Sequence, residues 1–152
     1  MNAKIAKIIA TFFYIGEIPA APGTIASLAG VFIYLTLFDN PAIFIFLTVF
    51  VTGIGFVFSG KHERALKTKD PGCIVIDEVA GMMISLMFLP VNFAVLITAF
   101  FLFRAFDMFK IYPVNKMEDL GGSLGIMADD IFAGIYANLI MHIALLFVPG
   151  KG

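Results

Sequence analysis

The sequence predicts an all-α integral membrane protein, a helical bundle that forms a single domain over residues 1–152. Of its 152 residues, 61% are apolar and only 14% are charged, whereas charged residues make up about a quarter of a soluble domain. The mean hydropathy is +0.99. The apolar residues fall into runs of helical length, separated by short segments rich in proline, glycine and charge. The chain is too short for a second domain.

The N-terminal segment, MNAKIAKIIATFFYIGEIPAAPG, resembles a signal peptide because early lysines precede an apolar run. Lys7 interrupts that run, and two prolines bracket the only plausible cleavage site. We therefore expect an uncleaved amphipathic helix on the membrane surface, with Lys4 and Lys7 on its polar side. It should end at Pro22–Thr24, where Thr24 is a residue type suited to cap the next helix.

Five apolar runs follow, at Ile25–Phe38, Ala42–Ser59, Cys73–Leu89, Phe93–Phe103 and Ile131–Val148. The first has 14 residues, about 21 Å of helix, which is short for a hydrocarbon core of about 30 Å. The second has 18 residues and is long enough to cross it. The polar segment Gly60–Gly72 is expected to be exposed, with a helical turn or two. We predict about five membrane-embedded helices, some of them short, besides the N-terminal amphipathic helix.

The segment Pro90–Asn92 allows two layouts. A tight hairpin there returns Arg104 and Asp107 to the side that holds Asp77 and Glu78, whereas one kinked span separates them by the bilayer. The hairpin places nine of the ten basic residues on one side, and the single span divides them seven to three. Both layouts obey the positive-inside rule, and the hairpin obeys it more cleanly.

The stretch from 103 to 134 carries most of the polar signal. Arg104, Asp107 and Lys110 are three residues apart, so a helix places them near one face. Arg104 and Lys110 either hold phosphate oxygens or pair with Asp107. The loop that follows supplies Gly121, Gly122 and Gly125. Their backbone N–H groups can turn toward an anion, although a flexible loop explains these glycines equally well.

Two acidic pairs occur in similar contexts, DEVAG at 77–81 and DDIFAG at 129–134. In each, small residues lie one turn beyond the acids and allow close helix packing. Packing of these two helices gathers four carboxylates, with Asp107 as a candidate fifth, and such a cluster requires a cation. Oxygen-only ligands favour Mg²⁺. The alternative is that the acids only stabilise helix N-termini, worth about 0.3–1 kcal/mol.

The remaining polar residues indicate no other chemistry. Cys73 lacks the following arginine of a cysteine phosphatase, His62 is expected in an exposed segment, and His142 is expected to be a satisfied histidine inside the last span. The net charge of −1, with basic residues clustered beside membrane segments, argues against a nucleic-acid partner.

Four blocks resemble the phosphatidylglycerophosphatase A family. They are PGTIASL (22–28), DPGCIVIDEVAG (70–81), FRAFDMFKIYPV (103–114) and LGIMADDIFAGIYA (124–137). They occur in the family's order across nearly the whole chain. The resemblance implies an all-helical, Mg²⁺-dependent phosphatase of the bacterial inner membrane. Its substrate is a phospholipid, phosphatidylglycerophosphate, which it converts to phosphatidylglycerol at the cytoplasmic face.

The resemblance carries the acidic site residues onto Asp77, Glu78, Asp107, Asp129 and Asp130, with Lys110 beside them. We divide the candidate site residues into three groups. The expected metal ligands are Asp77, Glu78, Asp129 and Asp130. The expected catalytic residues are Asp107, Lys110 and Asp130, and the expected phosphate-binding residues are Arg104, Lys110 and Thr24. The motifs do not divide the carboxylates between metal binding and proton transfer.

Two other functions remain as alternatives. A small ion or proton transporter uses intramembrane carboxylates as a relay, which requires acids at several depths of the membrane. In this chain the acids instead lie at one end of each apolar run. The second alternative is a non-catalytic membrane subunit, in which the polar blocks would have no function.

Overall fold

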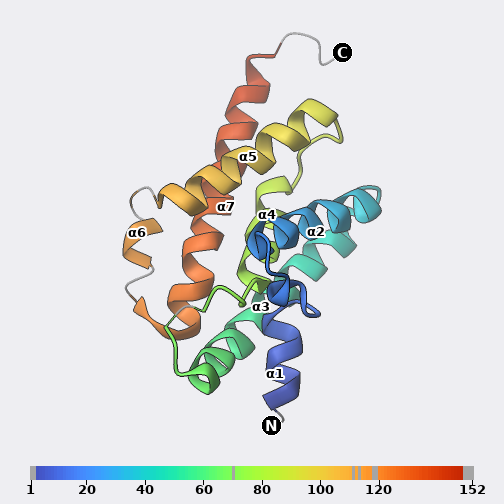
Figure 1. Ribbon diagram of the computed structural model, residues 1–152. Helices are drawn as coiled ribbons and strands as arrows, with labels where there is room; N and C mark the ends of the chain where they lie inside the picture. Colours follow the sequence, from blue (N-terminus) through green and yellow to red (C-terminus); the bar gives the residue numbers. More distant parts are fainter. Residues whose placement is uncertain (1–2, 70, 111, 113, 118–119, 149–152) are drawn as a thin grey trace.

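The computed structural model describes residues 3–69, 71–110, 112, 114–117 and 120–148, and within these ranges its regular elements are all helical. The helices are α1 (Ala3–Ala10), α2 (Pro22–Leu37), α3 (Pro41–Leu66), α4 (Ile76–Leu86), α5 (Phe93–Phe109), α6 (Val114–Met117) and α7 (Gly122–Leu146), with a 3-10 turn at Ile15–Glu17. The all-α prediction is therefore confirmed for the described residues (Figure 1).

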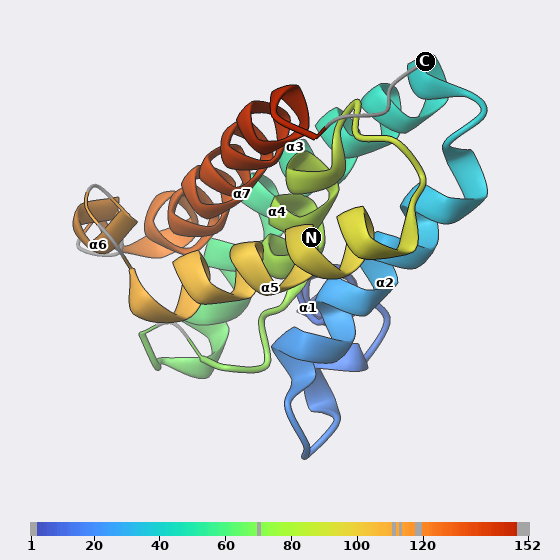
Figure 2. The ribbon, with the colours of Figure 1, turned by 90° about the horizontal axis from the view of Figure 1, so that it is seen from above.

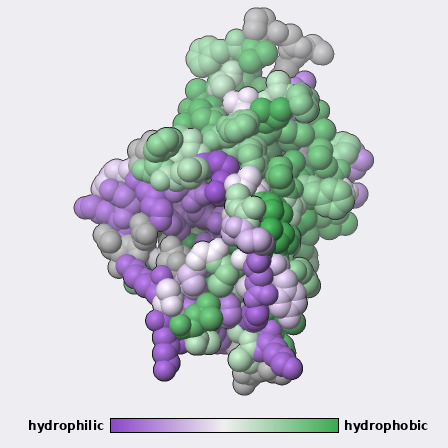
Figure 3. Space-filling view, in the orientation of Figure 1, coloured by the Kyte–Doolittle hydropathy of each residue, from purple (hydrophilic) through white to green (hydrophobic). Residues whose placement is uncertain are grey.

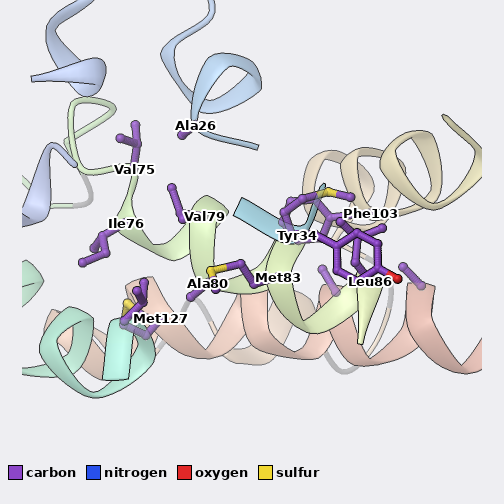
Figure 4. Packing of buried hydrophobic residues seen from close by; sticks show 14 of the residues in the cluster. Ala26, Tyr34, Val75, Ile76, Val79, Ala80, Met83, Leu86, Phe103 and Met127 are labelled. Carbon is purple, nitrogen blue, oxygen red and sulfur yellow. The ribbon is translucent and has the colours of Figure 1, made fainter. Parts of the chain in front are cut away.

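Helix α4 is the centre of the bundle. It packs against α2, α3, α5 and α7, which surround it when the molecule is seen from above (Figure 2). Nine of its eleven residues are buried, as expected for a helix that is apolar on nearly every side. Figure 4 shows Val79 and Met83 of α4 in this core, with Met127 from α7 and Phe103 from α5.

Two glycines determine how closely α4 and α7 approach. A Cβ atom built on Gly81 would lie 2.6 Å from the backbone oxygen of Asp130, and one built on Gly134 would overlap the backbone of Gly81. These are the small residues of the DEVAG and DDIFAG blocks. The prediction that they allow the two acidic helices to pack together is confirmed.

The chain between α4 and α5 forms the hairpin of the two layouts considered. Asn92 caps α5 by accepting a hydrogen bond from the backbone N–H of Ala94, at 2.9 Å. Helix α5 then runs back beside α4, so that Arg104 and Glu78 both lie against Gly23. The layout with one kinked span is therefore wrong.

The N-terminal predictions need two corrections. Helix α1 ends at Ala10 rather than at Pro22, and it packs against α3. It is amphipathic, with Ala6 and Ala10 buried and Lys4 exposed. Thr24 does not cap α2: Ala21 is the cap and Pro22 the first residue. Proline suits this first position because its fixed φ is helical and its missing N–H would have no helical partner.

Other boundaries also differ. Helix α3 continues to Leu66, so the segment expected to be exposed after Ser59 is largely helical, and His62 and Glu63 are buried. Helix α5 continues past Phe103 to Phe109, and α7 begins at Gly122 rather than Ile131. Tertiary contacts extend each helix through polar residues that a hydropathy pattern treats as its end.

Two described helices, α3 and α7, are long and apolar enough to cross a membrane, and α2 is apolar but shorter. The count of five embedded helices stays a prediction. The surface is also divided: apolar residues cover the upper right of Figure 3, and hydrophilic residues gather at the left and below.

The contact between Gly81 and Gly134 predicts the effect of Gly134→Ala. The added methyl group has no space against the α4 backbone, so α4 and α7 must separate. Overpacking of this kind costs about 1–3 kcal/mol. Thermal unfolding in detergent should show a lowered midpoint. Gly53→Ala is the control, because a Cβ there meets nothing within 4 Å; an equal loss in both variants would contradict the role of the contact.

Candidate active site

Three carboxylates from two helices meet beside the contact of the two glycines. Asp77 and Glu78 lie in the first turn of α4, and Asp130 lies on α7. One oxygen of each lies within 4.8 Å of the others. The exposed fraction is 8% for Asp77 and 2% for Asp130. Three of the four carboxylates that were predicted to gather thus do so, and we call Asp77, Glu78 and Asp130 the carboxylate cluster.

Each member of the cluster has one buried oxygen without a hydrogen-bond partner: Oδ1 of Asp77, Oε2 of Glu78 and Oδ2 of Asp130. Buried polar atoms are normally paired, and like charges at this separation repel strongly. A divalent cation between the oxygens removes both costs. A donor set made only of carboxylate oxygens fits Mg²⁺. The residues present therefore fit the cation that the sequence predicts.

The position of Asp129 and Asp130 argues against the capping alternative for this pair. They are the eighth and ninth residues of α7, so they do not open that helix as the sequence analysis expected. The field of a helix N-terminus acts mainly within its first turn. It does not account for two buried acids two turns further on. Asp77 and Glu78 do lie in a first turn, where the dipole contributes.

A second charged group comes from the C-terminal half of α5. Arg104 Nη1 donates to Asp107 Oδ2 at 2.6 Å, and both side chains are 16% exposed. Asp107 also interacts with Asp130, and Arg104 with Glu78. Of the two alternatives considered for Arg104, the structure shows the ion pair with Asp107, and this pair lies beside the carboxylate cluster.

Lys110 bonds across to α7. It is the C-cap residue of α5, in the left-handed conformation with φ 45°. Its Nζ lies 3.3 Å from Asp129 Oδ2. Asp129 Oδ1 in turn accepts the backbone N–H of Asp130. The two neighbouring acids are thereby divided: Asp129 bonds to Lys110, and Asp130 joins the cluster.

Thr24 is the next residue after Gly23, which contacts both Glu78 and Arg104.

The three glycines of the predicted anion-binding loop, Gly121, Gly122 and Gly125, have other neighbours. Gly121 and Gly122 line another hollow with Gly60, Glu63 and Arg64. Gly125 donates its N–H to Gly121. The structure does not bring the glycine loop to the carboxylate cluster.

Sequence reasoning overlooked Gly23 and Asn138. Only a residue without a side chain fits between Glu78 and Arg104. Asn138 Nδ2 donates to the carbonyls of Ser85 and Met87 and so joins α7 to the end of α4. A lone amide inside an apolar run was the signal available for Asn138.

The cysteine and the histidines do not enter the cluster. Burial raises the pKa of the Cys73 thiol, which favours the thiol over the nucleophilic thiolate. Its sulfur lies 3.9 Å from Nε2 of His62, which is buried rather than exposed as expected. His142 bonds to the carbonyl of Asn138, in agreement with the prediction of a satisfied histidine.

A model of the phosphatidylglycerophosphatase A family matches residues 8–145. The chain belongs to this family. It is 35% identical over 138 residues to a phosphatidylglycerophosphatase A of Escherichia coli, covering 89% of this chain and 80% of that protein. It is 34% identical to the protein of that name from Haemophilus influenzae, with 88% and 85% covered. No solved structure matches the chain significantly.

A third relative has a different name. The chain is 34% identical over 145 residues to a putative phosphatidylinositol-3-phosphatase of Bacteroides thetaiotaomicron, covering 90% of this chain and 91% of that protein. All three names describe phosphatases that act on phospholipid phosphomonoesters. The family thus agrees with the resemblance carried by the four sequence blocks.

The bond between Lys110 and Asp129 predicts a stability change for Lys110→Met. The substitution removes the ammonium group that bonds to Asp129, whose side chain is only 6% exposed. Hydrogen bonds to charged groups contribute about 1.5–3 kcal/mol, so a loss of that order is expected in the free energy of unfolding. The double variant Lys110→Met with Asp129→Asn should recover part of it. A surface pair would lose less than about 1 kcal/mol, and that result would contradict the structural bond.

Proposed function

We propose that this chain is a Mg²⁺-dependent lipid phosphatase that hydrolyses phosphatidylglycerophosphate to phosphatidylglycerol and phosphate in phospholipid biosynthesis. Its membership of the family supports the activity. The observation that carries the proposal is the set of three buried carboxylate oxygens without partners, next to a guanidinium group. A phosphomonoester needs a cation and positive side chains to offset its charge.

In this proposal Asp77, Glu78 and Asp130 would hold the ion, with Asp129 beside them. Bound Mg²⁺ would neutralise charge on the phosphoryl oxygens and make water a better nucleophile. Asp107 faces Asp130 and accepts a proton from the attacking water. Its ion pair with Arg104 keeps the carboxylate oriented for this role.

Three groups bind the substrate phosphate. The Arg104 guanidinium has donors beyond the Nη1 atom that bonds to Asp107, and Lys110 supplies a point charge from the adjacent turn. Thr24 lies in the first turn of α2, whose N–H groups have no partner within the helix. Since Gly23 in the same turn contacts Glu78 and Arg104, this positive end of the helix is directed toward the site.

The transporter alternative requires carboxylates at several depths of the membrane. Instead, the acids of α4, α5 and α7 meet in one place. A phosphatase acting on another lipid headgroup is the second candidate, and it is favoured by the relative named for phosphatidylinositol 3-phosphate. The cluster recognises the phosphomonoester that these substrates share, so the headgroup distinguishes the two functions.

We propose that the enzyme resides in the bacterial inner membrane with its site at the cytoplasmic face. The two apolar helices α3 and α7 and the bacterial relatives support the membrane location. The C-terminal turns of α3 carry Lys61 and Arg64, and positive residues favour the cytoplasmic side.

The proposed substrate is tested by phosphate release from purified protein in detergent micelles. We expect turnover of phosphatidylglycerophosphate with Mg²⁺ and none in excess chelator. Phosphatidylinositol 3-phosphate and phosphatidic acid are the comparison lipids. Faster turnover of either comparison lipid would assign the enzyme to that headgroup instead. Turnover in excess chelator would show that hydrolysis does not require Mg²⁺.

The carboxylate cluster predicts an unusual response of Asp130→Asn. Without Mg²⁺ the variant should unfold at a higher temperature than the wild type, because one of three repelling charges is gone. Added Mg²⁺ should raise the wild-type midpoint, because binding at a hundredfold excess over Kd adds about 2.7 kcal/mol to the free energy of unfolding. The midpoint of the variant should barely move, and its turnover should fall by about 10²-fold or more.

The control for this measurement is Asp39→Asn, which removes one charge at an exposed turn away from the cluster. Its response to Mg²⁺ should equal that of the wild type. An undiminished Mg²⁺ shift in Asp130→Asn would show that the ion binds elsewhere.

A further inference from the structure

An apolar groove separates α2 from α5. Its volume is about 300 Å³, and every residue lining it is apolar. The lining includes Leu28, Val31 and Leu35 from α2, and Phe93, Ile97 and Phe101 from α5. On α2 these positions follow the i, i+3, i+7 spacing, and on α5 they follow i, i+4, i+8. Each set therefore forms one stripe along its helix, and the two stripes face each other.

The groove exists because the two helices pack against α4 more than against each other. Helix α2 makes most of its contacts with α4 and only a few with α5. Figure 2 shows both helices on the outside of the bundle. Several lining side chains are exposed along the groove, among them Leu28 at 52% and Phe101 at 65%. The groove is therefore open along its side.

One end of the groove adjoins the candidate active site. Phe101 lies three residues before Arg104 on α5, about 4.5 Å along the helix axis. Leu28 follows Ser27, whose hydroxyl donates to the carbonyl of Gly23 at 2.9 Å. Gly23 and Arg104 meet beside Glu78. The two helices that line the groove therefore also contact the carboxylate cluster, at the ends that lie nearest the active site.

We propose that this groove holds one acyl chain of the diacyl lipid whose phosphomonoester reaches the carboxylate cluster. The inference rests on the proposed function. The occupant follows from the position of the groove next to the active site: when the lipid phosphate lies at Arg104, its acyl chains lie beside Leu28 and Phe101. From Leu28 to Leu35 the groove is about 10 Å long, shorter than half of a core of about 30 Å. It therefore holds the part of the chain nearest the headgroup.

The groove orients the substrate and contributes little to its binding affinity. A chain that moves from surrounding lipid into an apolar groove exchanges one apolar environment for another. What it gains is a fixed direction, which holds the phosphate at the site and raises the rate of the chemical step. Exposed apolar residues elsewhere, such as Phe46 and Val49 of α3, are not part of the lining of this groove.

The test fills the groove and maps its occupant. Ile97→Trp places a large side chain in the middle of the α5 stripe. We expect kcat/KM for long-chain phosphatidylglycerophosphate to fall about tenfold or more, because the phosphate is displaced from its productive position. Val49→Trp is the matched control on the exposed face of α3 and should retain wild-type turnover. Both variants should keep the wild-type thermal midpoint and its shift with Mg²⁺.

The second arm uses a diacyl phosphomonoester lipid with a photoreactive group on one acyl chain. Crosslinks in the wild type should concentrate in residues 28–35 and 93–101, relative to residues 46–53 of α3. Unlabelled phosphatidylglycerophosphate should suppress them, and phosphatidylglycerol, which lacks the phosphomonoester, should not.

The two arms separate this inference from the proposed function. Wild-type turnover together with full activity of Ile97→Trp, or with crosslinks spread evenly over α2, α3 and α5, overturns the groove and leaves the phosphatase intact. A wild type that releases no phosphate from any lipid overturns the proposed function. The crosslink positions alone then show whether an acyl chain occupies the groove.

Discussion

Repulsion between buried carboxylates is the constraint on which the rest of the structure depends. Asp77, Glu78 and Asp130 come together where two of them, Asp77 and Asp130, are buried, and like charges cost far more there than at a surface. The bundle must hold them there by other contacts. It does so through the backbone contact of α4 and α7 at Gly81 and Gly134, which brings two acid-bearing helices closer than ordinary side chains allow. A cation bound there would compensate the charge and so stabilise the same contact.

The buried end of α4 shows how the bundle satisfies its polar backbone groups. A helix that ends in apolar surroundings leaves carbonyl groups without partners, and lipid offers no hydrogen bonds in exchange. Asn138 donates to the carbonyls of Ser85 and Met87, and the Tyr34 hydroxyl donates to the carbonyl of Leu89. Side chains from α7 and α2 therefore complete the C-terminal end of α4. This lets the chain reverse into α5 and return Arg104 and Asp107 to the site.

The candidate site and the groove share their walls. The first turn of α2 and the C-terminal half of α5 contact the cluster, and the rest of the same two helices lines the apolar groove. This arrangement suits a molecule with a phosphate at one end and hydrocarbon at the other.

The sequence by itself determined the class of fold, because apolar runs of helical length in a weakly charged chain have no other stable arrangement in lipid. It also determined that the two acidic pairs would meet, since glycines one turn beyond them permit close helix packing. The tertiary structure decided how the acids divide. Asp129 and Asp130 are adjacent in sequence, yet about 100° apart around a helix, so one meets Lys110 and the other the cluster. The partner of Lys110 and the separation of the glycine loop from the cluster were decided in the same way. They depend on where α5 ends against α7, a long-range contact that no local pattern encodes.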